Sequence, residues 1–251
     1  MNKILELKNI YKNYQLIEKE EIVLSDINFS LNEGDFLGIV GPSGAGKSTL
    51  LSIISELEKP TKGKLIKKEK LKIAYMLQDD TLMPFLTILD NCLLGLKINK
   101  ICNKNNINMV KNLLIKYGLK DQMNKYPNEL SGGQKQRASL IRALSLSPDL
   151  LLLDEPFSAL DYQNRIKIAN DVRDIIKNEK KSLIIVTHDI SEAVNMCNRI
   201  IVLSNKPSKI KNIYDIDYEY KSDPIENRLS DGFMKYYKLI WRDLNNEWRE
   251  S

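Results

Sequence analysis

The chain has 251 residues, of which 43% are hydrophobic and 28% are charged, and its formal net charge is +5. This length suits one large domain or one domain with an inserted lobe, and the composition is that of a soluble, globular protein. A membrane-spanning chain is excluded, because no apolar run reaches the roughly 18 residues that cross a bilayer.

Charge begins at Lys3, too early for a signal peptide, so we expect a cytoplasmic protein that meets a membrane only through a partner. Lysines cluster between residues 62 and 72. Without interleaved aromatics or a recognition motif, they predict a solvated hairpin and no binding of nucleic acid. The three cysteines, Cys92, Cys102 and Cys197, lack metal-ligand spacing and are expected to be thiols.

Alternating apolar residues predict strands over residues 3–10 and 22–31, and an apolar run predicts a buried parallel strand over residues 36–40. A glycine-rich loop follows, with the sequence Gly41-Pro42-Ser43-Gly44-Ala45-Gly46-Lys47-Ser48, and leads into a helix expected from Lys47 to Glu56. Strand, glycine loop and helix in this order are the context that a phosphate-binding loop requires.

The glycines of this loop allow the backbone to turn tightly and to point its N–H groups at phosphates, and the helix adds the positive end of its dipole. Lys47 is expected to reach the β- and γ-phosphates, and the Ser48 hydroxyl is expected to ligate Mg²⁺. A chance match is the alternative, which the strand–loop–helix context disfavours. The residues expected to bind nucleotide here are Gly41, Pro42, Ser43, Gly44, Ala45, Gly46, Lys47, Ser48 and Thr49.

Residues 86–147 contain little glycine and proline and show helical periodicity, which predicts an inserted helical lobe. Near its end lies the segment Leu130-Ser131-Gly132-Gly133-Gln134. Ser131, Gly132 and Gly133 are expected to begin a helix and to offer its first N–H groups to an anion.

Strands and helices alternate after the lobe, which predicts a mostly parallel sheet. One leucine-rich strand ends at Asp154, a place where a carboxylate would hold Mg²⁺, and Glu155 follows as the candidate general base for the attacking water. The alternative is that both acids only cap the next element. His188, the only histidine, ends the strand over residues 182–187, where a γ-phosphate sensor would lie. A structural role is the alternative for this histidine.

The C-terminal stretch predicts a helix with one apolar face. That face packs on the domain's own surface or contacts a partner subunit. Its members are Leu229, Phe233, Tyr236, Ile240 and Leu244.

The glycine loop, the Leu-Ser-Gly-Gly-Gln segment and the acidic strand end resemble, in this order, those of the ATP-binding-cassette (ABC) family. The resemblance covers almost the whole chain and implies hydrolysis of ATP with Mg²⁺. It implies an α/β fold: a P-loop NTPase (RecA-like) core with a mostly parallel sheet, an N-terminal antiparallel β part and an inserted helical subdomain. The expected domains are an ATP-binding core of residues 1–85 and 148–215, a helical signature subdomain of residues 86–147 and a C-terminal extension of residues 216–251.

The resemblance also assigns roles to single residues. Gln78 matches the Q-loop glutamine, which approaches Mg²⁺ and the water, and Tyr14 matches the aromatic that stacks on adenine, with Tyr11 as an alternative. Ser158-Ala159-Leu160-Asp161 matches the D-loop, which crosses the dimer interface. In the family, the segment that contains Ser131, Gly132, Gly133 and Gln134 completes the ATP site of the opposite subunit. The implied assembly is a homodimer that holds two ATP molecules head to tail.

Within the family, residues 82–91 (LMPFLTILDN) are similar to a stretch of importer ATPases for nitrate, sulfonate and taurine, and residues 202–207 and 240–244 also fit this group. Phe85 replaces a commoner tryptophan. The resemblance implies an importer ATPase at the cytoplasmic face of the membrane, with permease subunits as partners and an extracytoplasmic solute-binding protein as an indirect one. The apolar segment Leu82–Leu89 would then dock the permease, or else it packs the helical lobe onto the core.

The rival hypothesis is a soluble ABC protein of translation, DNA repair or cluster assembly. Translation-type members usually carry two cassettes and repair-type members carry long coiled coils, whereas this chain has one cassette and no sustained heptads. A cassette that does not hydrolyse ATP conflicts with the presence of Glu155 and His188. The transported solute stays open, because the ATPase does not touch it.

Overall fold

The structure is a computed structural model, and it describes residues 2–15, 20–77, 82–158, 160–218 and 224–245. It consists of two compact units, one formed by Met1–Leu71 with Ser182–Ser251 and the other by Lys72–Lys181. Within the described ranges, no helix has both the length and the apolar character needed to cross a membrane.

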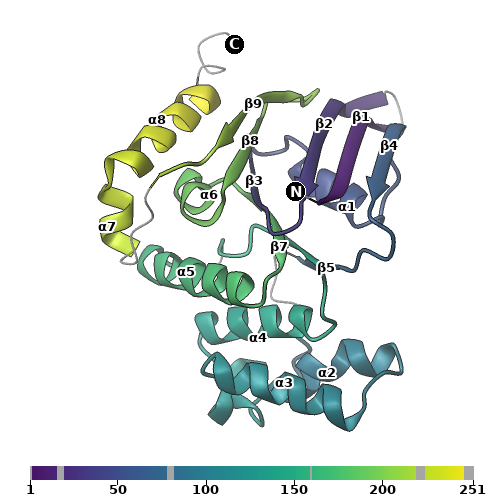
Figure 1. The fold of residues 1–251 in the computed structure, drawn as a ribbon, viewed down its shortest axis with the longest axis vertical. Helices are drawn as coiled ribbons and strands as arrows, with labels where there is room; N and C mark the ends of the chain where they lie inside the picture. Colours follow the sequence, from purple (N-terminus) through teal and green to yellow (C-terminus); the bar gives the residue numbers. More distant parts are fainter. Residues whose placement is uncertain (1, 16–19, 78–81, 159, 219–223, 246–251) are drawn as a thin grey trace. The chain divides into compact units, whose positions relative to one another are not determined.

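The first unit contains an antiparallel sheet in the order β2-β1-β4, whose three strands lie side by side in Figure 1. Its strands are β1 (Lys3–Gln15), β2 (Glu20–Asn32) and β4 (Lys62–Lys67). Leu7 of β1 lies opposite Phe29 on one side and Leu65 on the other. Both strands predicted in this region are confirmed, and β1 continues five residues beyond the predicted end at Ile10.

The second sheet of this unit positions the candidate site. In the order β7-β3-β8-β9, the strands β7, β3 and β8 are parallel and β9 is antiparallel to β8. The central strands are apolar and buried, as expected for parallel strands covered on both faces. The strands are β7 (Ser182–Thr187), β3 (Phe36–Val40), β8 (Arg199–Leu203) and β9 (Ile210–Asp215). The helices are α1 (Lys47–Ile54), α6 (Ile190–Met196), α7 (Pro224–Leu229) and α8 (Asp231–Asn245).

The lysine-rich stretch does not form the predicted hairpin. Its first part is β4, which pairs with β1 in the antiparallel sheet. The strand that follows it, β5 (Ile73–Met76), pairs in parallel with β6 (Leu150–Asp154) in the second unit. The hairpin was wrong because strand pairing depends on distant partners, whereas the prediction of solvated lysines holds for the exposed side chains of Lys62, Lys64, Lys68, Lys70 and Lys72.

The predicted C-terminal helical face is correct for Phe233 and Ile240, which are buried in α8, and wrong for Leu229, which is 75% exposed. The chain divides here into α7 and α8. Ser230 lies between them and accepts a hydrogen bond from the Phe233 N–H through its hydroxyl, at 3.3 Å. A side-chain acceptor at this position starts a new helix, so Leu229 leaves the face that Phe233 and Ile240 share.

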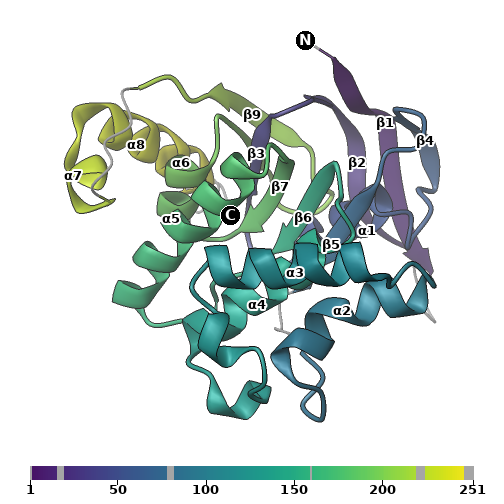
Figure 2. The same ribbon diagram turned by 60° about the horizontal axis from the view of Figure 1, so that its bottom comes forward.

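In the described part of the chain, the second unit holds the parallel pair β5 and β6, four α-helices and two short 3-10 helices. Figure 2 shows α2, α3 and α4 grouped together, and each of them contacts the other two. All three lie within the stretch that the sequence predicts to be helical. The elements are α2 (Ile88–Ile98), α3 (Lys104–Lys116), η1 (Lys120–Gln122), η2 (Pro127–Glu129), α4 (Gly132–Leu144) and α5 (Tyr162–Asn178).

Candidate functional site

The glycine loop joins β3 to α1, as the sequence predicts. Gly44 and Gly46 have φ angles of 77° and 79°, in the left-handed region that residues with a Cβ adopt only with strain. At Gly46 there is also no space for a side chain, since an added Cβ would lie 2.5 Å from Val23 Cγ1. The shape of the loop therefore requires glycine at Gly46 for two reasons.

The side chain of Lys47, the first residue of α1, folds back over this loop. It is 6% exposed, and its Nζ atom donates hydrogen bonds to the carbonyl oxygens of Gly41 at 3.0 Å and of Pro42 at 2.8 Å. Ser48, the next residue, is exposed. An ammonium group held beside the first N–H groups of a helix makes a positively charged site, so the loop fits the phosphates of a nucleotide.

The sheet brings His188 to the same edge as the glycine loop. Strands β3 and β7 are parallel neighbours, and Val40 at the end of β3 pairs with Thr187 at the end of β7. Gly41 and His188 directly follow these two residues, so both leave the sheet at its carboxyl edge. Ligands of open α/β sheets bind at this edge. The register thus joins two parts of the predicted site that are far apart in the sequence.

Tyr14 of β1 is held beside the start of α1. Its hydroxyl donates a hydrogen bond to Glu58 Oε2 at 2.7 Å, and the Nζ atom of Lys12 lies 4.8 Å from the centre of its ring. Burial, and then the bond to Glu58, raise the pKa of the Tyr14 phenol, while a hydrogen bond with the Thr49 side chain lowers it. Thr49 lies in the first turn of α1, so these contacts tie the ring to the helix that follows the glycine loop.

In the second unit, Asp154 and Glu155 lie at the carboxyl end of β6. Asp154 is 6% exposed and accepts a hydrogen bond from the hydroxyl of Tyr75, on β5, at 3.0 Å. Glu155 is half-buried and has a φ angle of 43°. A left-handed backbone is unfavourable for a residue with a long side chain.

The segment Leu130–Gln134, called the Ser131 segment below, contains the start of α4, as predicted: Ser131 is the N-cap residue and Gly132 is the first residue of the helix. The Ser131 hydroxyl accepts the Gln134 N–H at 3.4 Å, and the Gln134 side chain accepts the Ser131 N–H at 3.0 Å. This capping box fixes the start of the helix. The N–H groups of Gly132 and Gly133 belong to the first turn, where a helix offers no acceptor of its own.

The two glycines also allow α4 to approach its neighbours closely. A Cβ on Gly133 would lie 2.6 Å from Ile168 Cδ1 of α5, and one on Gly132 would lie 3.0 Å from Leu160 Cδ2. The start of α4 lines a hollow of about 480 Å³ together with Asp161. Asp161 caps α5 by accepting the Asn164 N–H at 3.1 Å. The predicted signature residues Ser131 to Gln134 thus line one hollow together with Leu160 and Asp161 of the predicted D-loop.

Two ion pairs link α3 and α4 to α5 and to Glu179, which directly follows it. Arg137 of α4 pairs with Asp171 of α5, and Lys116 of α3 pairs with Glu179 at 2.7 Å. The Glu179 carboxylate and the Tyr117 hydroxyl raise the pKa of Lys116 to about 12.

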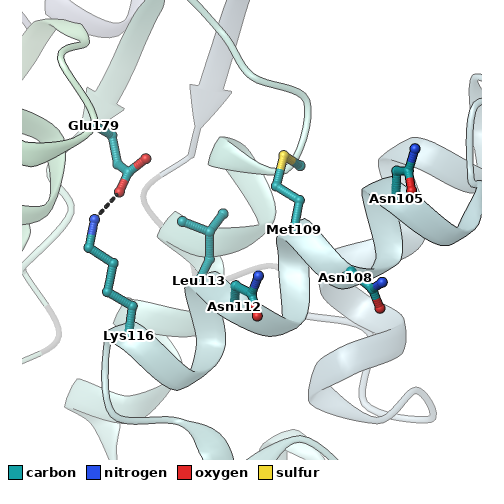
Figure 3. Close-up of a pocket in the computed structure, with 7 residues that line it drawn as sticks. All are labelled: Asn105, Asn108, Met109, Asn112, Leu113, Lys116 and Glu179. Atoms are coloured by element: carbon teal, nitrogen blue, oxygen red, sulfur yellow. Dashed lines mark hydrogen bonds and ion pairs between the residues drawn. The ribbon is translucent and has the colours of Figure 1, made fainter.

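Figure 3 shows the pair of Lys116 and Glu179 at one end of a second hollow, which has a volume of about 450 Å³ and is lined also by Asn105, Asn108 and Asn112 of α3. No residue of the predicted site lines this second hollow.

The segment Leu82–Leu89 is partly buried and partly exposed. Leu82 and Ile88 are buried, whereas Met83 and Phe85 are 37% and 73% exposed. The buried Asn91 holds the segment in shape: its side chain accepts the Met83 N–H at 2.7 Å and donates to the carbonyl oxygens of Met83 and Leu86 at 3.1 and 3.0 Å. The sequence did not predict this role, although an asparagine within an apolar segment is a signal for it.

Part of the predicted site lies outside the described residues, namely Gln78 and, in the D-loop, Ala159. Where the structure does describe the chain, no group of three His, Cys, Asp or Glu side chains could hold a metal ion. The predicted Mg²⁺ ligands Ser48 and Asp154 carry oxygen donors, which Mg²⁺ prefers, and this ion commonly takes its remaining ligands from water and substrate phosphates.

Among known proteins, the chain is similar to ATP-binding cassettes. The family model described as "ABC transporter" matches residues 24–158. The ABC transporter ATP-binding protein YtlC of Bacillus subtilis is 40% identical in an alignment 249 residues long, which covers 96% of this chain and 96% of that protein. The aliphatic sulfonates import ATP-binding protein SsuB of Zymomonas mobilis is 40% identical over 210 residues, with 81% of this chain and 83% of that protein covered.

Among solved structures, the fold is similar to a dimeric ATP-binding cassette in a post-hydrolysis state, bound to ADP and phosphate. That cassette is 32% identical, with a TM-score of 0.71, and the match covers 86% of this chain and 100% of the cassette. The similarity supports the α/β P-loop fold inferred from the sequence.

Proposed function

The chain belongs to the ABC transporter family and is an ATPase, and we propose that it is the subunit that drives a separate membrane permease for import of a small solute. Nitrate, sulfonate, taurine or a related compound is the proposed solute class. This class is supported by the similarity to import proteins for aliphatic sulfonates. The observation that carries the proposal is the pairing of Val40 with Thr187, because it supports a glycine loop and a histidine acting on one nucleotide.

In the proposed nucleotide site, Lys47 binds the β- and γ-phosphates and His188 contacts the γ-phosphate. Glu155 orients the attacking water and accepts its proton, with Gln78 near the same water. Tyr14 stacks on adenine with the ring face opposite Lys12. Mg²⁺, held by Ser48, Asp154 and Gln78, would neutralise charge that develops on the phosphoryl oxygens. The donor types fit this ion, since all of these ligands are oxygen atoms.

We propose that the active form is a head-to-tail homodimer in which the Ser131 segment and Asp161 of one chain complete the ATP site of the other. The capped start of α4 supports this role, because its first-turn N–H groups suit an anion. The structure of a related cassette as a dimer also supports it. ATP binding would close the dimer and hydrolysis would reopen it, which couples ATP to two states of the permease.

The proposed permease contact is the exposed tip of the Leu82–Leu89 segment, formed by Met83, Pro84 and Phe85. Apolar side chains that are exposed to solvent, on a loop that hydrogen bonds with Asn91 hold in shape, are typical of a surface that a partner covers. This contact would hold the chain at the cytoplasmic face of the membrane, with a solute-binding protein as an indirect partner. We keep residues 86–147 as the proposed signature subdomain, residues 1–85 and 148–215 as the core and residues 216–251 as the extension.

Reconstitution with the permease in proteoliposomes tests this function. Hydrolysis of ATP should rise several-fold when the permease and a solute-loaded binding protein are present, and radiolabelled solute should accumulate only with ATP. The same complex carrying Lys47→Ala provides the inactive control. If the rate of ATP hydrolysis is the same with and without the permease, and none of the nitrate, sulfonate or taurine solutes tested is taken up, the result would instead support a soluble ABC ATPase.

A further inference from the structure

A buried threonine hydroxyl at the end of β7 makes two hydrogen bonds of different kinds. Thr187 Oγ1 donates to Glu192 Oε2 at 2.6 Å and accepts the Asp189 N–H at 3.0 Å. Thr187 and Glu192 are 1% and 3% exposed. The Thr187 hydroxyl donates its hydrogen to the carboxylate in a hydrogen bond, and one of its lone pairs accepts the Asp189 N–H. In such a chain each bond strengthens the other.

A second set of bonds closes the same turn. The Asp189 side chain accepts the N–H groups of Ser191 at 2.7 Å and of Glu192 at 3.3 Å, and so caps α6. Thr187, Asp189 and Glu192 are thereby joined in a ring of hydrogen bonds. His188 lies between the first two, so the backbone on both sides of the histidine is held from within the protein.

The burial of Glu192 requires an explanation. It lies on a short helix beside the buried residues Ala193, Val194 and Met196, and an apolar residue there would avoid the cost of removing a carboxylate from water. Polar networks in such places often maintain a particular geometry at the expense of stability. In this protein the network surrounds His188. This residue is exposed and lies in the chain between the end of β7 and the capped start of α6.

We propose that Glu192 is a positioning residue for His188, acting through the Thr187 hydroxyl. This inference rests on the proposed role of His188 as the γ-phosphate contact. The network sets the direction in which the chain leaves β7, and therefore the place of the imidazole at the carboxyl edge of the sheet. Loss of the network should slow the chemical step and leave ATP binding nearly intact, since the hydrogen bonds from Lys47 to Gly41 and Pro42 in the glycine loop are not part of the network.

The test compares substitutions within the network with a matched control. Thr187→Val keeps the shape and removes the hydroxyl, and it should lower kcat about 10- to 100-fold while the KM for ATP changes less than about threefold. Thr187→Ser restores the hydroxyl and should restore most of kcat. Asn195→Ala is the control, since Asn195 is also buried on α6 but bonds to Asn227, at 3.1 Å. It should lower the melting temperature and leave kcat near the parent value.

A double-mutant cycle shows whether the effect passes through the histidine. In a His188→Ala background, Thr187→Val should cause almost no further loss of turnover, measured as release of radiolabelled phosphate. A second loss of the same size in that background would overturn the proposal, as would normal kcat in Thr187→Val or an equal loss in Asn195→Ala. If His188→Ala alone hydrolyses ATP at the parent rate, the proposed role of His188 fails, a result distinct from failure of the network.

Discussion

The Nζ atom of Lys47 donates a hydrogen bond to the carbonyl oxygen of Pro42 over 2.8 Å. Backbone oxygens thus hold the ammonium group over the loop and restrict the conformations of the lysine side chain. A charge that is already in place loses less conformational entropy when phosphate binds, which is the benefit of preorganisation. The same contact makes the loop and the lysine a single unit whose removal should affect ATP binding directly.

Lys47→Ala should therefore weaken ATP binding by about 1.5–3 kcal/mol, the range for hydrogen bonds to charged groups. Isothermal titration with ATP measures this change. Lys62→Ala is the control, because Lys62 is an exposed lysine of β4 in the same unit. Equal affinity in Lys47→Ala and Lys62→Ala would remove Lys47 from the phosphate site.

Tyr14→Ala should weaken ATP binding by about 1–3 kcal/mol, by analogy with base–aromatic stacking. Turnover at saturating ATP should survive, because the ring does not touch the reacting atoms. Tyr14→Phe keeps the ring and loses only the hydroxyl, with its bonds to Glu58 and Thr49, so its affinity for ATP should lie close to that of the parent. If Tyr14→Ala binds ATP as the parent does, the stacking residue is Tyr11 or there is none.

Ser131→Arg should block hydrolysis at the partner's site, since the signature and the glycine loop lie in different units of the chain. When it is mixed with Lys47→Ala, each mixed dimer holds one composite site with both defects and one with neither. The mixture should hydrolyse ATP faster than either variant alone. Ser131→Ala checks for loss of the helix cap alone, which should cost about 1 kcal/mol of stability. A mixture as inactive as its parents would count against composite sites.

Phe85→Asp should abolish co-purification with the permease and leave the melting temperature and the basal ATPase rate unchanged. Phe85 is 73% exposed, and exposed substitutions usually change stability by no more than about 0.5 kcal/mol. Ile115→Asp, at a 50% exposed position of α3, is the matched control and should retain the permease. A large drop in melting temperature would show that Phe85 is packed, and permease binding by a stable Phe85→Asp variant would remove the docking surface.

Local patterns predicted the elements well and their pairing poorly. The apolar run of β3, the glycine loop and the start of α4 at Ser131 depend on neighbouring residues, and all three are confirmed. The hairpin at the lysines was wrong because β4 and β5 find partners far along the chain. The break before α8 was also missed, since the apolar periodicity continues through Leu229 while the Ser230 cap interrupts the helix.

The residues that hold the site were harder to predict than those proposed to do the chemistry. The motif around His188 indicates a function, but the register of β7 with β3 follows only from the folded sheet. Glu192 and Arg137 act through contacts with Thr187 and Asp171 that a single sequence does not reveal, whereas the asparagine at Asn91 was a signal because it interrupts an apolar segment. The catalytic and binding roles of all the candidate site residues stay predictions.

The central claim, that ATP closes a dimer which Glu155 then reopens by hydrolysis, is tested most directly by the molar mass of Glu155→Gln with Mg²⁺ and ATP. The substitution keeps size and hydrogen bonding but removes the base, so turnover should almost vanish while ATP binding persists. Light scattering should then give a stable species of twice the 28.9 kDa of one chain, and the mass should fall back to one chain after ATP is removed. A Glu155→Gln protein that hydrolyses ATP at the parent rate, or that binds ATP and stays at 28.9 kDa, would contradict the account.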